Sequence, residues 1–74
     1  MEDKEFYEAL GQALRQERKR RKWTLAEVAE KLGVSLSTVS CWEIGERTIS
    51  ASQWKRYCHL LGMSLDEFVE KYSL

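Results

Sequence analysis

Hydrophobic and polar positions between residues 24 and 44 follow the spacing of two short amphipathic helices separated by a glycine. Apolar side chains recur at helical spacing within each half, at Val28 and Leu32, then at Val39 and Trp42, with Val34 between the halves. Ala29 is small where the two helices would cross, and Gly33 stands where the first helix must end. The pattern predicts helices over residues 25–32 and 36–43, the second of them polar on one side.

Three further segments carry apolar residues at helical spacing and lack the alternation typical of strands. They predict helices over about residues 3–21, 51–61 and 65–72. The expected core positions are Phe6, Leu10, Ala13 and Leu14 in the first, Ala51, Trp54, Cys58 and Leu61 in the second, and Leu65, Phe68 and Val69 in the third. The chain contains no proline and is predicted to be all-α, with five helices.

Hydroxyl residues mark where these helices begin. Thr24, Ser50 and Ser64 are each followed three residues later by Glu or Gln and flanked by an apolar pair, the signature of a capping box with a hydrophobic staple. At Ser35 the staple is present, but Thr38 replaces the acid. Either this helix end binds an anion, which a carboxylate in the first turn would repel, or Thr38 is simply tolerated at this position. Glycines at positions 33, 45 and 62 are expected to form left-handed caps.

Composition narrows the possible chemistry. Seventy-four residues make one small domain. Cys41, Cys58 and the single histidine, His59, provide neither a disulfide framework nor a set of zinc ligands. The chain has no glycine-rich phosphate loop and no paired catalytic groups, so we expect no enzyme activity, no metal, no cofactor and no small-molecule ligand. It shows neither a membrane-length apolar run nor a signal peptide, which predicts a cytoplasmic protein without membrane contact.

The charge is zero overall but uneven along the chain. Twelve basic and twelve acidic residues cancel, whereas residues 11–22 carry +5 and residues 46–59 carry +2. Residues 1–10, 23–45 and 60–74 are net acidic. Binding to phosphates requires a local basic surface and not a basic total, so neutrality lowers the expectation of nucleic-acid binding without excluding it.

Residues 10–72 resemble the lambda-repressor-like (Cro/Xre-type) helix-turn-helix family. The resemblance rests on Leu-Gly-x-x-Leu-Arg at 10–15, the two-helix pattern at 24–44, Trp-Glu-Ile-Gly-Glu-Arg at 42–47 and Leu-Gly-Met-Ser-Leu-Asp-Glu-Phe at 61–68. It implies one compact five-helix DNA-binding domain over residues 1–74, with the motif at 24–44 and a short acidic N-terminal extension at 1–8. The family binds double-stranded operator DNA, commonly as a two-fold homodimer, with the second motif helix in the major groove.

The resemblance also implies a set of DNA-contacting residues. Base contacts are expected from the exposed start of the helix at 36–43, at Leu36, Ser37, Ser40 and Cys41. Serine can bond to base edges, and Leu36 can either meet a thymine methyl group or pack against the neighbouring turn. Cys41 is either an oxidation-sensitive thiol or a small surface side chain. Phosphate contacts are expected at Lys22, Thr24, Leu25, Ala26, Thr38 and Arg47.

Several positions depart from the family pattern. Gln or Arg is common where this chain has Leu25, and a basic residue is common where it has Glu46. The usual Gln, Arg or Asn base readers are also missing. These departures predict modest affinity, with part of the specificity coming from DNA shape.

The basic run at residues 18–22 has two interpretations. It either flanks the DNA backbone, with Arg21 and Lys22 nearest, or forms a solvated helix end that complements the helix dipole. By resemblance, Arg18 pairs instead with Glu43 in a buried structural ion pair.

Two functions follow as alternatives. The first is a sequence-specific transcriptional regulator that binds a palindromic operator as a homodimer. The helix at 65–72, through Phe68 and Tyr72, and the N-terminal extension either form the dimer surface or simply close the core of a small domain. The second is a protein-interaction module, such as an antitoxin-like or adaptor subunit, that keeps the fold but binds DNA weakly.

Overall fold

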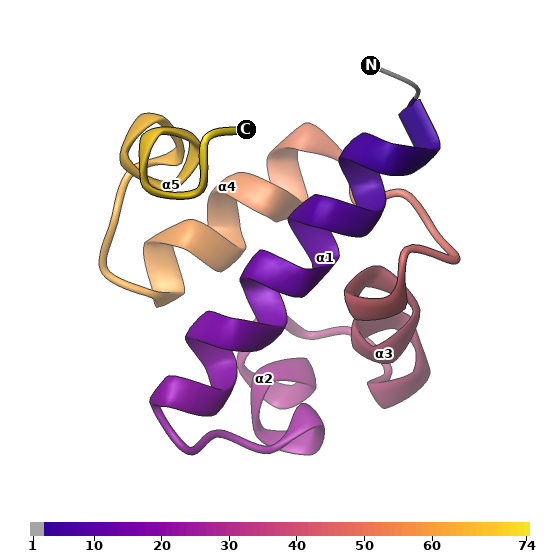
Figure 1. The fold of residues 1–74 in the computed structure, drawn as a ribbon. Helices are drawn as coiled ribbons and strands as arrows, with labels where there is room; N and C mark the ends of the chain where they lie inside the picture. Colours follow the sequence, from indigo (N-terminus) through magenta and orange to yellow (C-terminus); the bar gives the residue numbers. More distant parts are fainter. Residues whose placement is uncertain (1–2) are drawn as a thin grey trace.

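Five helices make up the computed structural model, which describes residues 3–74 and contains no strand in that range. The helices are α1 (Asp3–Arg20), α2 (Leu25–Leu32), α3 (Leu36–Ile44), α4 (Ala51–Leu60) and α5 (Leu65–Tyr72). Every bound lies within one residue of the expectation from the sequence. In Figure 1, α1 crosses the front of the molecule, with α2 and α3 at its lower right, α4 behind it and α5 at the upper left.

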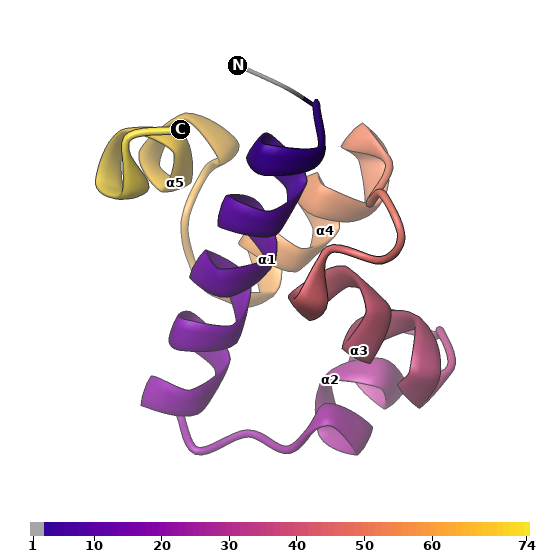
Figure 2. The same cartoon turned by 45° about the vertical axis from the view of Figure 1, so that its right-hand side comes forward.

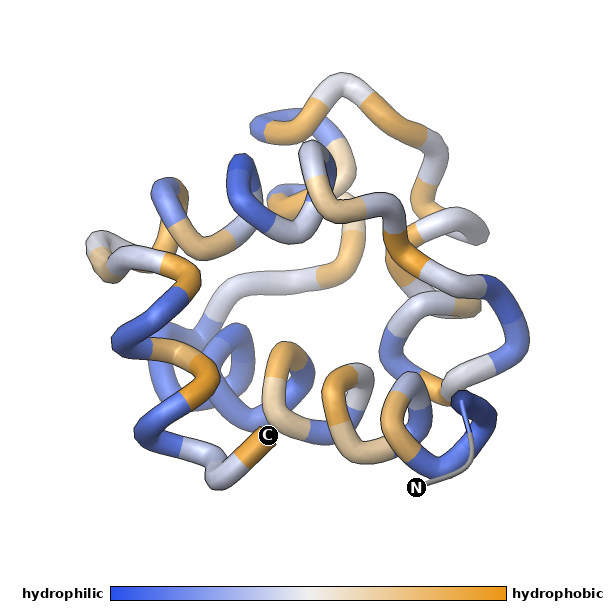
Figure 3. The backbone as a smooth tube through the Cα atoms, turned by 90° about the horizontal axis from the view of Figure 1, so that it is seen from above, coloured by the Kyte–Doolittle hydropathy of each residue, from blue (hydrophilic) through white to orange (hydrophobic). Residues whose placement is uncertain are grey.

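A single core joins all five helices. Hydrophobic segments recur along each helix and alternate with hydrophilic ones (Figure 3). The buried hydrophobic side chains are Leu10, Ala13, Leu14, Val28, Ala29, Leu32, Val39, Trp42, Ile49, Tyr57, Cys58, Leu61 and Phe68. One core assignment was wrong, because Ala51 is the first residue of α4 and is exposed. Phe6, Trp54, Leu65 and Val69 are half-buried, and Tyr57, which the sequence did not assign to the core, is fully buried.

The helix ends confirm most of the capping expectations. Thr24 and Ser64 form complete capping boxes with Glu27 and Glu67. At Ser50 only half of the box is present, because the hydroxyl accepts from the Gln53 amide at 3.2 Å but also donates to the Gln53 side-chain oxygen at 3.3 Å. The Gln53 oxygen therefore serves the hydroxyl instead of the backbone N–H of residue 50. Glycines 33, 45 and 62 adopt left-handed φ values of 70°, 79° and 79°.

Helix α1 approaches α3 most closely at Gly11, a contact that the sequence analysis did not anticipate. A β-carbon at Gly11 would lie 2.2 Å from the carbonyl oxygen of Trp42 and 2.6 Å from that of Glu43. Only glycine allows the two backbones to meet at this distance. The position of α3 on the domain is therefore set directly by the backbone of α1.

Helix α5 is fastened to α1 through the buried carboxylate of Glu17. This side chain is 1% exposed and accepts from Lys71 Nζ at 2.6 Å, from Arg21 Nη1 at 2.6 Å and from the Tyr72 hydroxyl. Burial raises the pKa of Glu17, but the hydrogen bonds from Lys71, Tyr72 and Arg21 outweigh burial and lower the pKa to about 2. Glu17 is therefore charged and fully paired.

Candidate nucleic-acid interface

Helix α3 has one buried face and one open face. Val39, Trp42 and Glu43 pack into the domain, and Figure 2 shows α3 beside α2 at the edge of the molecule. The four residues expected to contact bases, Leu36, Ser37, Ser40 and Cys41, share the other face by their spacing. Ser37 is exposed, and Ser40 and Cys41 are half-buried. Leu36 is 49% exposed, so half of its surface remains free for a binding partner.

Three hydroxyl groups gather at the beginning of α3. Ser35 caps the helix by accepting from the Thr38 amide at 3.2 Å, and its Oγ shares hydrogen bonds with Thr38 Oγ1 at 2.7 Å and Ser37 Oγ at 3.1 Å. No acidic residue occupies the first turn. The N-terminal end of a helix carries a partial positive charge, so this end offers hydroxyl groups and a favourable potential to an anion.

Arg47 reaches back from the loop after α3 to the same end of the helix. Its Nη1 lies 3.4 Å from Thr38 Oγ1, and its side chain is exposed. The structure therefore brings Thr38 and Arg47 together, although they are nine residues apart. A guanidinium beside hydroxyl groups is a suitable site for a phosphate oxygen.

The beginning of α2 presents a second set of polar groups. Thr24 Oγ1 accepts from the Glu27 amide at 3.0 Å, and Glu27 Oε1 accepts from the Thr24 amide at 2.9 Å. The hydroxyl proton of Thr24 stays free to donate, and the amides of Leu25 and Ala26 are among those without a partner inside the helix. Hydrogen bonds from Thr24 lower the pKa of Glu27, so a carboxylate remains charged beside the expected phosphate position.

The expected ion pair between Arg18 and Glu43 is present and bidentate. Arg18 Nε lies 2.6 Å from Glu43 Oε2, and Arg18 Nη2 lies 3.0 Å from Glu43 Oε1. The third guanidinium nitrogen, Nη1, donates to the carbonyl oxygen of Trp23 at 2.7 Å. One side chain from α1 thus holds both the end of α3 and the loop that leads into α2. Both charges are largely buried, which makes the pair structural.

Two members of the basic run, Arg18 and Arg21, form their hydrogen bonds inside the domain. Arg21 donates to Glu17 and, through Nη2, to the carbonyl oxygen of Leu61 at 2.8 Å, so its guanidinium is engaged inside the domain, a role that neither interpretation of the run included. Arg20 lies 3.4 Å from Glu17. Among residues 3–74, Lys22 forms no ion pair, is exposed and has a left-handed φ of 60°. Lys22 is the member of the run best placed to meet a ligand next to α2.

Glu46 lies on the open side of α3. The thiol of Cys41 points to its carboxylate, with Sγ 3.8 Å from Oε2. A negative charge therefore stands next to the expected base-contacting face and beside Arg47. The modest affinity expected from the sequence stays a prediction.

The two residues expected to form a dimer interface lie mainly inside the domain. Phe68 is 0% exposed, so its assignment to an interface was wrong, because no part of the side chain is left to touch a second copy. Tyr72 is half-buried, and its hydroxyl donates to Glu17.

Sequence reasoning missed Glu17 altogether, although a signal existed. Residues 10, 14 and 17 follow helical spacing, so Glu17 shares the buried face of Leu10 and Leu14. A carboxylate on such a face requires cationic partners, and Arg20 and Arg21 follow three and four residues later.

Between residues 3 and 74, no three His, Cys, Asp or Glu side chains gather as metal ligands would. No helix in that range combines the length and apolar character needed to cross a membrane.

The chain is similar to a known protein family and to several solved structures. A family model described as helix-turn-helix matches residues 14–68. Two crystal structures of the clp gene regulator ClgR from Corynebacterium glutamicum are 36% identical over 90% of this chain, with TM-scores of 0.83 and 0.82, and the match covers 71% and 86% of those chains. A structure of Fe(II)-HppE with the alternative substrate (S)-1-HPP is 30% identical over 84% of this chain, with a TM-score of 0.75, but only 32% of that chain is covered. No curated protein sequence gives a significant match.

Proposed function

The chain belongs to the helix-turn-helix family, and from this premise we propose that it is a DNA-binding transcriptional regulator that places α3 in the major groove of operator DNA. The observation that carries the proposal is the open face of α3. That face begins at a helix end with three hydroxyl groups and no acid, and a guanidinium lies beside it.

Base recognition is assigned to the outer side of α3. Ser37 and Ser40 offer hydroxyl groups to base edges, and the exposed half of Leu36 fits a thymine methyl group. Cys41 lies on the same side, next to Glu46. Short hydroxyl side chains have little preference among bases, so we infer that DNA shape supplies part of the specificity.

Phosphate contacts are assigned to the two helix ends beside that face. At α2 they come from Lys22, the Thr24 hydroxyl and the amides of Leu25 and Ala26. At α3 they come from Thr38 and Arg47. The small number of cations predicts a shallow salt dependence, because each neutralised phosphate contributes about −0.9 to the slope of log K against log salt.

A homodimer on a two-fold symmetric operator completes the proposal. The recognition helices of such a dimer lie about 34 Å apart, one turn of DNA. The domain measures 31 × 24 × 21 Å, so two copies in contact can span that distance. Phe68 takes no part in this contact, because it is buried within each copy.

Selection from a random duplex pool at two salt concentrations tests this function. The expected result is an enriched palindrome with half-sites one turn apart, whose binding weakens with salt. If the protein retains no duplex at low salt, the proposal is refuted and the alternative, a protein-interaction module on the same fold, is favoured.

Two charge variants test the placement of the interface. Ser37→Glu puts a carboxylate into the first turn of α3, and Arg47→Glu reverses the guanidinium charge, so both should abolish retention on the selected duplex. Lys4→Glu, an exposed lysine in the first turn of α1, is the matched control and should bind normally. Normal binding by both interface variants, with circular dichroism confirming the fold, would show that DNA is not read by this face.

A further inference from the structure

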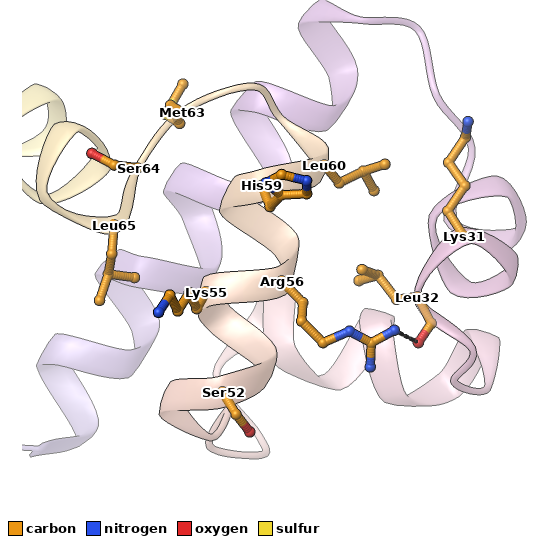
Figure 4. A pocket seen from close by; sticks show the side chains of 10 residues that line it. All are labelled: Lys31, Leu32, Ser52, Lys55, Arg56, His59, Leu60, Met63, Ser64 and Leu65. Carbon is orange, nitrogen blue, oxygen red and sulfur yellow. Dashed lines mark hydrogen bonds between the residues drawn. The ribbon is translucent and has the colours of Figure 1, made fainter.

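A groove of about 770 Å³ runs along α4, between the end of α2 and the beginning of α5. Figure 4 shows the side chains around it, which come from α2, α4 and the turn that leads into α5. The apolar lining comes from Leu32, Leu60, Met63 and Leu65, of which Leu32 is buried and the other three are half-buried. The groove therefore offers apolar surface that the chain itself does not cover completely.

The charged side chains that line the groove, Lys31, Lys55 and Arg56, are all cations. The other polar lining residues are Ser52, His59 and Ser64, and none of the residues that line the groove is acidic, although acids and bases are equally numerous in the chain. Arg56 is fixed in place, because its Nη2 donates to the carbonyl oxygen of Leu32 at 3.0 Å. Lys55 is exposed and forms no ion pair within residues 3–74. Lys31 is close enough to Glu27 to help lower the pKa of that carboxyl, so the net positive charge of the rim comes mainly from Lys55 and Arg56.

The dimensions of the groove fit a short helix. Its lining residues on α4 begin at Ser52 and end at Leu60, so they occupy successive turns of one face of that helix. This stretch is roughly 12 Å long at 1.5 Å per residue, or about two helical turns. An amphipathic helix places apolar anchors at positions i, i+3 or i+4, and i+7 in such a groove, with its polar flanks above the rim.

We propose that this groove binds an acidic amphipathic helix of a partner protein, with apolar side chains between α2 and α4 and carboxylates paired with Lys55 and Arg56. The positive rim supplies the complementarity, and it disfavours a basic helix of the same apolar pattern. Nucleic acid fits this surface poorly, because its phosphates would contact only the cationic rim and would leave the apolar lining exposed to water.

The two most acidic helix beginnings of a second copy, those of α1 and α5, do not supply the required helix. The acids at the beginning of α1, Asp3, Glu5 and Glu8, are exposed, but their apolar neighbours Phe6 and Tyr7 pack against the core of their own domain. The same holds for α5, where Asp66 and Glu67 precede the buried Phe68. An external helix with free apolar anchors is therefore the better occupant.

The groove is separate from the face assigned to DNA. No residue of α3 lines it, and α2 contributes Lys31 and Leu32 from its C-terminal end, whereas the expected phosphate contacts lie at the N-terminal end. The domain can therefore hold a partner helix without covering α3. The proposal does not depend on DNA binding, and its test contains no DNA.

The test uses two synthetic fluorescein-labelled helical peptides of equal length. Both have leucine at i, i+3 and i+7, one with glutamate and the other with lysine at the flanking positions. Fluorescence anisotropy at low salt should show that the acidic peptide binds at least about tenfold more tightly than the basic one. Lys55→Glu should weaken binding of the acidic peptide by about tenfold, and the control Lys4→Glu should leave it unchanged.

Amide chemical shifts of the full chain locate the bound peptide. The expected shifts fall at residues 31–32 and 52–65. Equal binding of the two peptides, unchanged binding to Lys55→Glu, or shifts confined to α1 or α3 would each overturn the proposal. Concentration-dependent shifts in the groove without any peptide would assign it to a second copy and would also overturn the proposal.

Discussion

The substitution Glu17→Gln should remove a large part of the stability of the domain. The carboxylate is 1% exposed and accepts hydrogen bonds from Lys71, Arg21 and Tyr72. A glutamine has only one acceptor oxygen, and its NH₂ group would face the hydrogen-bond donors of Lys71, Arg21 and Tyr72. A pKa lowered from 4.5 to about 2 corresponds to about 3 kcal/mol of stabilisation of the charged form. We therefore expect unfolding free energy to fall by about 3 kcal/mol, as for other broken buried ion pairs.

The pH dependence provides a second measure of the same network. The pKa of Glu17 is lower in the folded than in the unfolded chain, so its contribution is fully present above pH 4.5 and is lost as pH falls toward 2. Urea unfolding followed by tryptophan fluorescence and far-ultraviolet circular dichroism measures both effects. The native chain should lose stability between about pH 5 and pH 2, and Glu17→Gln should lack that component of the loss.

An exposed acid on α5, Glu70, supplies the matched control. Glu70→Gln makes the same chemical change without a buried partner and should alter the unfolding free energy by less than about 0.5 kcal/mol. The reasoning fails if Glu17→Gln costs no more than this control. It also fails if Glu17→Gln keeps the full acid sensitivity of the native chain.

Three further outcomes can be measured. Gly11→Ala should lower the unfolding free energy by about 1–3 kcal/mol, because α3 must retreat from the new methyl group; a gain in stability, as helix propensity alone would give, would contradict the close packing. Glu46→Gln removes the carboxylate beside Cys41 and should tighten duplex binding a few-fold in anisotropy titrations; unchanged binding would place Glu46 outside the interface. Ellman's reagent at pH 7.5 should label Cys41 but leave Cys58 unlabelled until urea is added, because Cys58 is buried and burial raises the pKa of its thiol to about 11. Labelling of both thiols in the folded chain would refute this expectation.

Local signals explain why the helices could be predicted so closely. A cap such as Thr24 with Glu27 or Ser64 with Glu67 acts within four residues, and so does a left-handed glycine at position 33. Sequence alone therefore contains nearly all the information that sets a helix bound. The half-formed capping box at Ser50 was not predicted. Whether that box is complete depends on whether the Gln53 side-chain oxygen accepts from the Ser50 hydroxyl or from the Ser50 backbone N–H.

Contacts between distant segments were harder to predict. The burial of Glu17 depends on Lys71 and Tyr72, more than fifty residues away, and the closeness of α1 and α3 at Gly11 depends on how two backbones cross. The groove along α4 combines residues from three parts of the chain and has no motif of its own. The candidate DNA-contacting residues were predicted by family resemblance, and their roles stay a prediction.

The two faces of α3 are under different constraints in evolution. Truncating Trp42 on the inner face should cost about 3–5 kcal/mol, a large share of the stability of a domain this small. Replacing Ser37 on the outer face should change stability by less than about 0.5 kcal/mol. Mutations can therefore accumulate on the outer face while every intermediate still folds. After gene duplication, two copies of this domain can diverge at the outer face of α3 without either one passing through an unstable form.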